Sequence, residues 1–181
     1  MEAVELVRPD RVIPARTRVL GAAVTVSAGW ALIGIALSWW MILHTSTATA
    51  EGLILIWVVI IAGTRLAMVW WARRRPRVTW SGVLVAAEAR EHSLRTRVLP
   101  EDPRLRVAVA ADSCRRIELA TESLVPLAGL LMWSVVLPLS WVAGPSIIWA
   151  VGQAVLTVRA VRSWRYLGML DARKDSVLRP R

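Results

Sequence analysis

Glu88 and His92 are the side chains of this sequence best suited to chemistry, because a helix would place residues four apart on one face. A carboxylate beside an imidazole can bind zinc or iron, or can act as general acid and base. A metal site needs at least three converging ligands. Asp112 is expected to point to the opposite side of its helix, and Glu122 to lie well away from His92. The sequence therefore predicts a solvated pair, with no metal and no cofactor.

Signatures of catalysis are absent elsewhere in the sequence, which has no phosphate-binding glycine loop, no HExxH and no nucleophile elbow. The single cysteine, Cys114, excludes an intramolecular disulfide and a zinc site built from several cysteines. An enzyme is therefore not expected, and a membrane-surface enzyme using Glu88, His92 or Glu122 is kept as a third hypothesis.

Arg65, next to Thr64, is the one charged residue inside a predicted membrane span. Charges at membrane depth often mark ion or substrate pathways. The competing interpretation is that Arg65 extends its side chain to the inner membrane surface, since it lies eight residues, or about 12 Å along a helix, before Arg73. The sequence leaves both roles open.

Four apolar segments must position these residues, since 56% of the 181 residues are hydrophobic. A run of roughly 20 such residues crosses the hydrocarbon core as a helix. We therefore expect an all-α integral membrane protein with four transmembrane helices in two hairpins, and a cytoplasmic antiparallel helical hairpin between the second and third. The expected segments are an N-terminal segment 1–18, spans 19–43, 53–72, 124–143 and 146–166, outer connections 44–52 and 144–145, the cytoplasmic hairpin 73–123, and a basic tail 167–181.

The net charge of +10 follows the positive-inside rule. Apart from Arg65, every Arg and Lys lies in 1–18, 73–123 or 159–181, which places both termini in the cytoplasm. This distribution explains the charge without nucleic acid and predicts a bilayer with anionic headgroups as partner. A sequence with 22 Arg, one Lys and no Asn indicates GC-rich coding and a bacterial inner membrane. The expected headgroup contacts are Arg73, Arg74, Arg75, Arg159, Arg162 and Arg165.

A cleaved signal peptide is the alternative for the first apolar run, because basic residues precede it and Ala48 and Ala50 follow it. The run from Val19 to Leu43 has 25 residues, which exceeds the apolar region usual for a signal peptide. A membrane span is therefore the favoured interpretation.

The tryptophans fit the same arrangement, because indole rings favour the headgroup level. The group expected toward the outer face is Trp39, Trp40, Trp57, Trp141 and Trp149. The group expected toward the inner face is Trp70, Trp71, Trp80 and Trp164. Only Trp30 and Trp133 fall in mid-span, where we interpret them as packing residues.

Prolines divide the hydrophilic insert into two helices, since Pro100 and Pro103 cannot lie inside a helix. Asp102 followed by Pro103 predicts an N-cap and the first helical residue. The new helix is expected to continue into the third span, with a kink at Pro126.

Steps of three and four residues predict an antiparallel seam between these two helices. The expected pairs are Trp80 with Thr121, Val83 with Ile117, Ala87 with Cys114, Arg90 with Ala110, and Leu94 with Val107. Arg90 is the irregular member and is expected to raise its charged head into water.

Two pairs of small residues in the spans, Gly34 with Ser38 and Gly63 with Ala67, would let helices approach closely in lipid. The spacing predicts either packing within the chain or contact between copies.

Two main hypotheses for function follow. The first is a non-catalytic subunit or assembly factor of a larger membrane complex, which docks a protein partner through the hairpin and the basic tail. The alternative is a small transporter or channel that works as a homo-oligomer, with Arg65 in the pathway.

Overall fold

The computed structural model describes residues 13–44, 50–73, 80–136 and 139–178. These residues are almost entirely helical and contain no strand, which confirms the predicted all-α class. The helices are α2 (Arg16–His44), α3 (Ala50–Ala72), α4 (Trp80–Thr96), α5 (Pro103–Glu122), α6 (Leu124–Val136) and α7 (Leu139–Leu178).

Three of these helices are long and apolar enough to cross a membrane, which indicates a membrane protein. They are Arg16–His44, Glu51–Ala72 and Val142–Ser176 within α7. Only 22%, 28% and 6% of their apolar windows are buried inside the chain. The remaining apolar side chains face outward, as contact with lipid requires.

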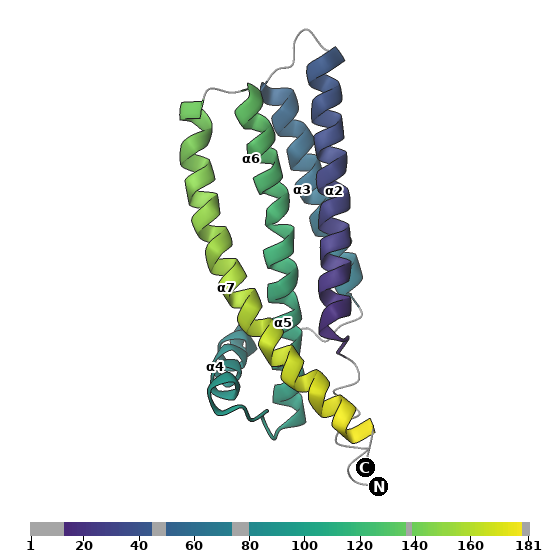
Figure 1. Ribbon diagram of the computed structural model, residues 1–181, viewed down its shortest axis with the longest axis vertical. Helices are drawn as coiled ribbons and strands as arrows, with labels where there is room; N and C mark the ends of the chain where they lie inside the picture. Colours follow the sequence, from purple (N-terminus) through teal and green to yellow (C-terminus); the bar gives the residue numbers. More distant parts are fainter. Residues whose placement is uncertain (1–12, 45–49, 74–79, 137–138, 179–181) are drawn as a thin grey trace. The chain divides into compact units, whose positions relative to one another are not determined.

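The predicted turn at Gly144 and Pro145 is wrong, because both residues lie inside α7. The third apolar helix, α6, ends at Val136, and α7 begins at Leu139 and runs antiparallel to it (Figure 1). Proline within a membrane helix is tolerated where neighbouring groups take up the hydrogen bond that it cannot make. Of the predicted span 124–143, α6 covers only the first 13 residues, and α7 begins at Leu139.

The chain forms two compact units. The first, here called the bundle unit, comprises Ala22–Ala72 and Leu119–Leu156. Within it, α3 packs against α6, and Trp57, Ile60 and Val125 form the buried centre. Partly buried side chains of Trp30 and Trp133 pack against this centre, which agrees with the predicted packing role of both.

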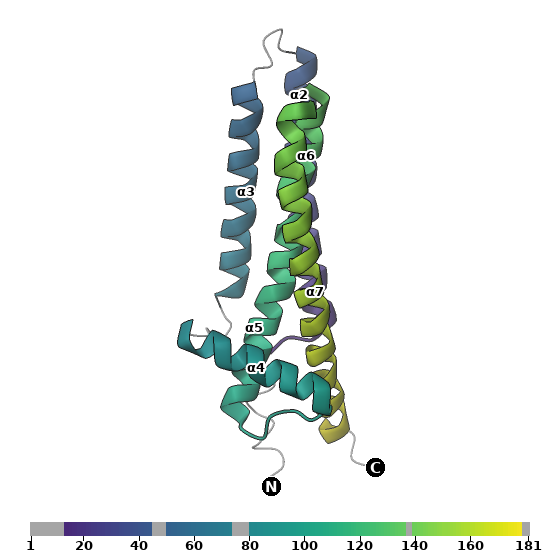
Figure 2. The ribbon, with the colours of Figure 1, turned by 90° about the vertical axis from the view of Figure 1, so that its left-hand side faces the viewer.

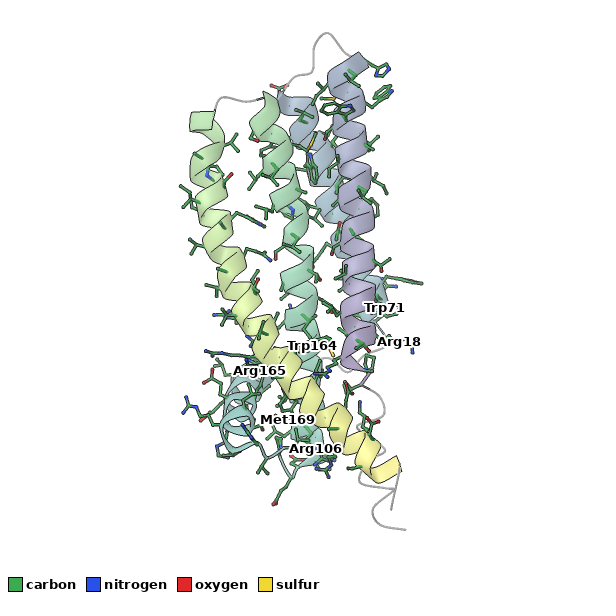
Figure 3. The ribbon with its side chains drawn as sticks, in the orientation of Figure 1. Arg18, Trp71, Arg106, Trp164, Arg165 and Met169 are labelled. Carbon is green, nitrogen blue, oxygen red and sulfur yellow. The ribbon has the colours of Figure 1, made fainter. Side chains whose placement is uncertain are left out.

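The second, here called the α4–α5 unit, comprises Met1–Gly21, Arg73–Glu118 and Thr157–Arg181. Its core joins the start of α2, the α4 and α5 helices and the last turns of α7, where Trp164 and Met169 lie (Figure 3). The buried members are Ile13, Val19, Ala86, Val109, Ala110, Ala111, Cys114, Ile117, Tyr166, Leu167 and Leu170. Residues 167–176 are thus part of a helix that contributes to a core, and not a separate tail.

The α4 helix lies across α5, as Figure 2 shows, and not alongside it. The fully buried residues of α4 are Ala86, Arg90 and Ser93, whereas Val83, Ala87 and Leu94 are half-buried. A crossing brings only a short stretch of each helix into contact. The predicted antiparallel seam is therefore corrected to a crossing, in which Arg90 is the one fully buried residue among the predicted α4 positions whose burial is described, Val83, Ala87, Arg90 and Leu94.

The residues predicted to begin α5 do so in the structure. Asp102 Oδ1 accepts a hydrogen bond from the backbone N–H of Arg104 at 2.8 Å, which confirms Asp102 as N-cap and Pro103 as the first helical residue. The buried guanidinium of Arg106 donates to the carbonyls of Pro100 and Glu101, at 2.9 and 2.7 Å. At the end of α4, Arg97 adopts a left-handed conformation with φ of 58°.

Candidate functional site

Arg65 forms an ion pair with Glu122 inside the bundle unit, with 2.8 Å between Nη1 and Oε2. The side chain of Arg65 is 47% exposed and that of Glu122 is 15% exposed. The pair joins α3 to the end of α5 and neutralises the one charge predicted inside a span. Sequence reasoning recognised both residues but did not pair them, because 57 residues separate them along the chain.

The junction between α5 and α6 is the second polar feature of the bundle unit. Ser123 is the only residue between the two helices, and Pro126 follows it by three positions. Proline cannot donate the helical hydrogen bond to the carbonyl four residues before it, and its ring crowds that carbonyl. The helix that was expected to kink at Pro126 is therefore interrupted one turn earlier, at Ser123.

The α7 helix supplies the donors that this junction needs. Trp149 Nε1 donates to the carbonyl of Ser123 at 2.9 Å, and Gln153 Nε2 donates to the carbonyl of Ala120 at 3.0 Å. The hydroxyl of Ser123 lies within hydrogen-bond distance of both the Ala120 carbonyl and Gln153 Oε1. Its single proton can serve only one of these acceptors at a time. These three side chains therefore attach α7 to the junction.

Gln153 was missed by the sequence analysis, although a signal for it exists. The sequence has one Gln and no Asn, so Gln153 is the only side-chain carboxamide of the protein. It lies in the middle of a 13-residue apolar run, where an unpaired amide would be costly in lipid. A polar partner on a neighbouring helix could have been inferred from that cost.

Trp57 is the largest fully buried side chain of the bundle unit, with 1% exposure. This burial inside the chain was not predicted, and the expected location of Trp57 toward the outer face stays a prediction. Its Nε1 donates to Ser38 Oγ at 3.1 Å, and its ring lies directly against Gly34 and Gly129. A Cβ atom at Gly129 would lie 2.8 Å from the ring, so this position has no room for a side chain.

The small-residue pairs thus serve packing within the chain. Gly34 and Ser38 receive Trp57, and Gly63 lies under the ring of Trp30, where a Cβ would meet it at 2.6 Å. Ala67 is half-buried. The glycines of this bundle leave space for tryptophan rings. The small-residue pairs had been expected instead to let two helix backbones approach closely.

A buried charged cluster lies in the α4–α5 unit. Asp112 Oδ2 accepts hydrogen bonds from Arg90 Nη1 at 2.8 Å and from Arg116 Nε at 2.6 Å. The side chains of Arg90 and Asp112 are 5% and 7% exposed. The expectations that Asp112 points away from the contact and that Arg90 reaches water are both wrong. A buried arginine needs a carboxylate, and the heptad assignment assumed an apolar seam.

Burial lowers the pKa of Arg90 from its ordinary value, and the positive charge of Arg116 lowers it further, whereas Asp112 opposes both effects. The Nε of Arg90 is buried and has no hydrogen-bond partner among the residues that the structure describes. Two guanidinium groups thus bond to the same oxygen of one buried carboxylate.

Contacts between the two ends of the chain complete the α4–α5 unit. Asp171 Oδ2 accepts a hydrogen bond from the backbone N–H of Arg16 at 3.2 Å, at the first residue of α2. Lys174 Nζ donates to the carbonyl of Ile13 at 3.0 Å. The guanidinium of Arg16 stacks 4.9 Å from the Trp164 ring centre. The C-terminal region thus caps the beginning of α2.

The remaining predicted residues occupy varied positions. Cys114, Ala110, Ile117 and Thr121 are buried, Val107 is half-buried, and Glu88 and His92 are exposed. Among the described ranges, no three metal-binding side chains gather. Arg162 pairs with Glu91 at 2.9 Å, whereas Arg73, Arg159 and Arg165 are exposed. The side chain of Trp80 and the residues Arg74 and Arg75 lie outside what the structure describes.

Comparisons with known proteins identify no relative: no protein-family model, no curated protein and no solved structure matches the chain.

Proposed function

We propose that this protein is a non-catalytic subunit or assembly factor of a larger membrane complex, held in a bacterial inner membrane. The proposal rests on the exposure of α7. Only 6% of its most apolar stretch is buried by other parts of the chain. Its exposed aliphatic side chains include Ile147, Ile148, Val151, Val155, Val158 and Val161. This long apolar face suits the helix of a partner subunit.

Four crossings with both termini in the cytoplasm remain part of this proposal. Three basic regions must lie on one side of the membrane, which requires an even number of crossings. The 18 residues from Leu119 to Val136 that belong to the bundle unit would extend about 27 Å as helix. That length is close to the hydrocarbon thickness, so the end of α5 and α6 together can supply the remaining crossing.

The alternative, an oligomeric transporter with Arg65 in the pathway, draws support from the polar groups gathered at the α5–α6 junction. The contacts of these groups weigh against it. Arg65 is bonded to Glu122, and Gln153 is bonded to Ala120 and Ser123. A transported ion would have to displace these bonds.

Site-specific photocrosslinking in the native host tests the proposal. A photoreactive residue at Ile148, which is 74% exposed on α7, is compared with one at Leu55, which is 65% exposed on α3. We expect Ile148 to form an adduct with a different membrane protein that also co-purifies in fixed stoichiometry in mild detergent.

Adducts only between copies of this chain, with no other subunit in the purified particle, would contradict the proposal and favour the transporter. In that case liposome flux by wild type and Arg65→Ala would decide whether Arg65 lies in a pathway. Reporter fusions at both termini test the topology independently, and opposite locations of the two ends would exclude four crossings.

A further inference from the structure

The beginning of α4 has an apolar surface that its own unit leaves uncovered. Leu84 is 77% exposed and Val85 is 55% exposed, although both belong to a helix whose opposite face is buried. The buried face consists of Ala86, Arg90 and Ser93. The exposed apolar residues are confined to the early turns of α4, because Glu88, Glu91 and His92 occupy the exposed face farther along.

The position of this surface in the chain places it near the membrane. The α3 helix ends at Ala72 and α4 begins at Trp80, so seven residues connect them. Even a fully extended connection of this length reaches only about 25 Å. Leu84 therefore stays within a short distance of the end of an apolar, membrane-spanning helix.

The connection itself carries charge of the appropriate sign. Residues 73–79 contain four arginines and no acidic residue. Clustered arginines beside a membrane helix are attracted to anionic headgroups, with about 1 kcal/mol for each residue near the surface. Apolar side chains next to such a cluster are typical of helices that lie in the membrane interface.

We propose that the first turns of α4 lie in the headgroup layer of the cytoplasmic leaflet, with Leu84 and Val85 inserted among the lipids. The partner is an anionic lipid surface. This inference rests on the proposed membrane topology. It adds to that topology a helix, α4, that lies at the membrane surface without crossing it. The Arg90–Asp112 bond would then connect the lipid-bound helix to α5.

Fluorescent labelling of single cysteines tests the inference in the full-length protein. An environment-sensitive dye is attached at Leu84→Cys, at Glu88→Cys and at Leu55→Cys, and each variant is reconstituted into vesicles of phosphatidylcholine and phosphatidylglycerol. Wild type serves as the labelling blank, because Cys114 is fully buried. Emission and quenching by lipid-attached nitroxide or by aqueous iodide are measured.

We expect the dye at position 84 to emit at shorter wavelength than the dye at 88, and to be quenched by nitroxide placed near the headgroups. The dye at 88 should be quenched by iodide. Equal iodide quenching at 84 and 88 would overturn the inference and leave this surface available to a protein. Position 55 reports separately on the span: iodide quenching there would overturn the membrane assignment of α3 itself.

Discussion

At the scale of single residues, Asp112 is the position whose loss should cost most, because it holds the charges of Arg90 and Arg116 inside a core. Breaking a buried ion pair by removing one partner typically costs about 3–5 kcal/mol, since the other charge stays buried without compensation. We expect Asp112→Ala to lower the thermal midpoint of the α4–α5 unit strongly in detergent.

The control is the double variant Arg90→Met with Asp112→Leu, which replaces two charges by apolar groups of similar size. Such replacements are often neutral or stabilising. A double variant as unstable as Asp112→Ala would show that Arg116, and not the loss of compensation for Arg90, determines the effect.

Arg97 offers a prediction of the opposite sign. Its φ of 58° is a conformation that glycine adopts at helix C-termini without the steric cost of a Cβ. We expect Arg97→Gly to raise the free energy of unfolding by about 0.5–1 kcal/mol. The matched variant Arg95→Gly lies inside α4, is 82% exposed, and should lower it by about 1 kcal/mol. Chemical denaturation of both variants gives the comparison.

Several residue roles could be read from the sequence, and others could not. Asp102 and Pro103 act through their immediate neighbours, so local rules were sufficient. Asp112 and Gln153 act through partners 22 and 33 residues away, and a periodic pattern carries no information about such partners. The burial of Trp57 was missed for a related reason, because a rule for tryptophan depth cannot show that two glycines on other helices leave space for its ring.

At the scale of helices, the attachment of α7 to the α5–α6 junction depends on Gln153. Hydrogen bonds between membrane helices contribute about 0.6 kcal/mol on average and up to about 1.7 kcal/mol. We expect Gln153→Leu to destabilise the bundle unit by about 1 kcal/mol and to increase the mobility of α7, measured by denaturant titration and by spin labels at Val155. Gly152→Ala, at a position with open space around it, is the control and should not loosen α7.

The packing of α6 against Trp57 gives a second test at this scale. A methyl group at Gly129 would meet the indole ring at 2.8 Å, and overpacking a filled core costs about 1–3 kcal/mol. We expect Gly129→Ala to lower the thermal stability accordingly. Gly29→Ala, on a helix position with nothing within 4 Å, should instead stabilise by up to about 1 kcal/mol. Equal effects of the two substitutions would exclude the steric explanation.

The helices themselves were predictable where length and composition are decisive. The apolar runs 19–43 and 53–72 correspond to α2 and α3 within a few residues. The turn predicted at Gly144 and Pro145 was wrong because proline can also lie inside a membrane helix, and the local sequence does not distinguish the two cases. The crossing of α4 over α5 was missed because a heptad pattern does not determine the angle between two helices.

At the scale of the whole molecule, the C-terminal turns of α7 are expected to be required for folding of the α4–α5 unit. Removing residues 167–181 deletes Leu167 and Leu170 from its core, together with the contacts of Asp171 and Lys174. We expect this truncation to expose Arg106, now 1% exposed, to cleavage by trypsin. Mass spectrometry of the fragments is the measurement, and removal of 177–181 alone is the control. Protection of Arg106 in the longer truncation would contradict this role.

The bond between Asp171 and the first residue of α2 spans 155 positions of the chain, and the bond between Lys174 and Ile13 spans 161. During synthesis, the beginning of α2 can receive these hydrogen bonds only after Asp171 and Lys174 have been made. By contrast, Gly34, Ser38 and Trp57 all belong to the first third of the chain, so α2 and α3 can assemble around the Trp57 ring early. The order of synthesis therefore makes the partners of the Trp57 ring on α2 available before the residues that complete the α4–α5 unit.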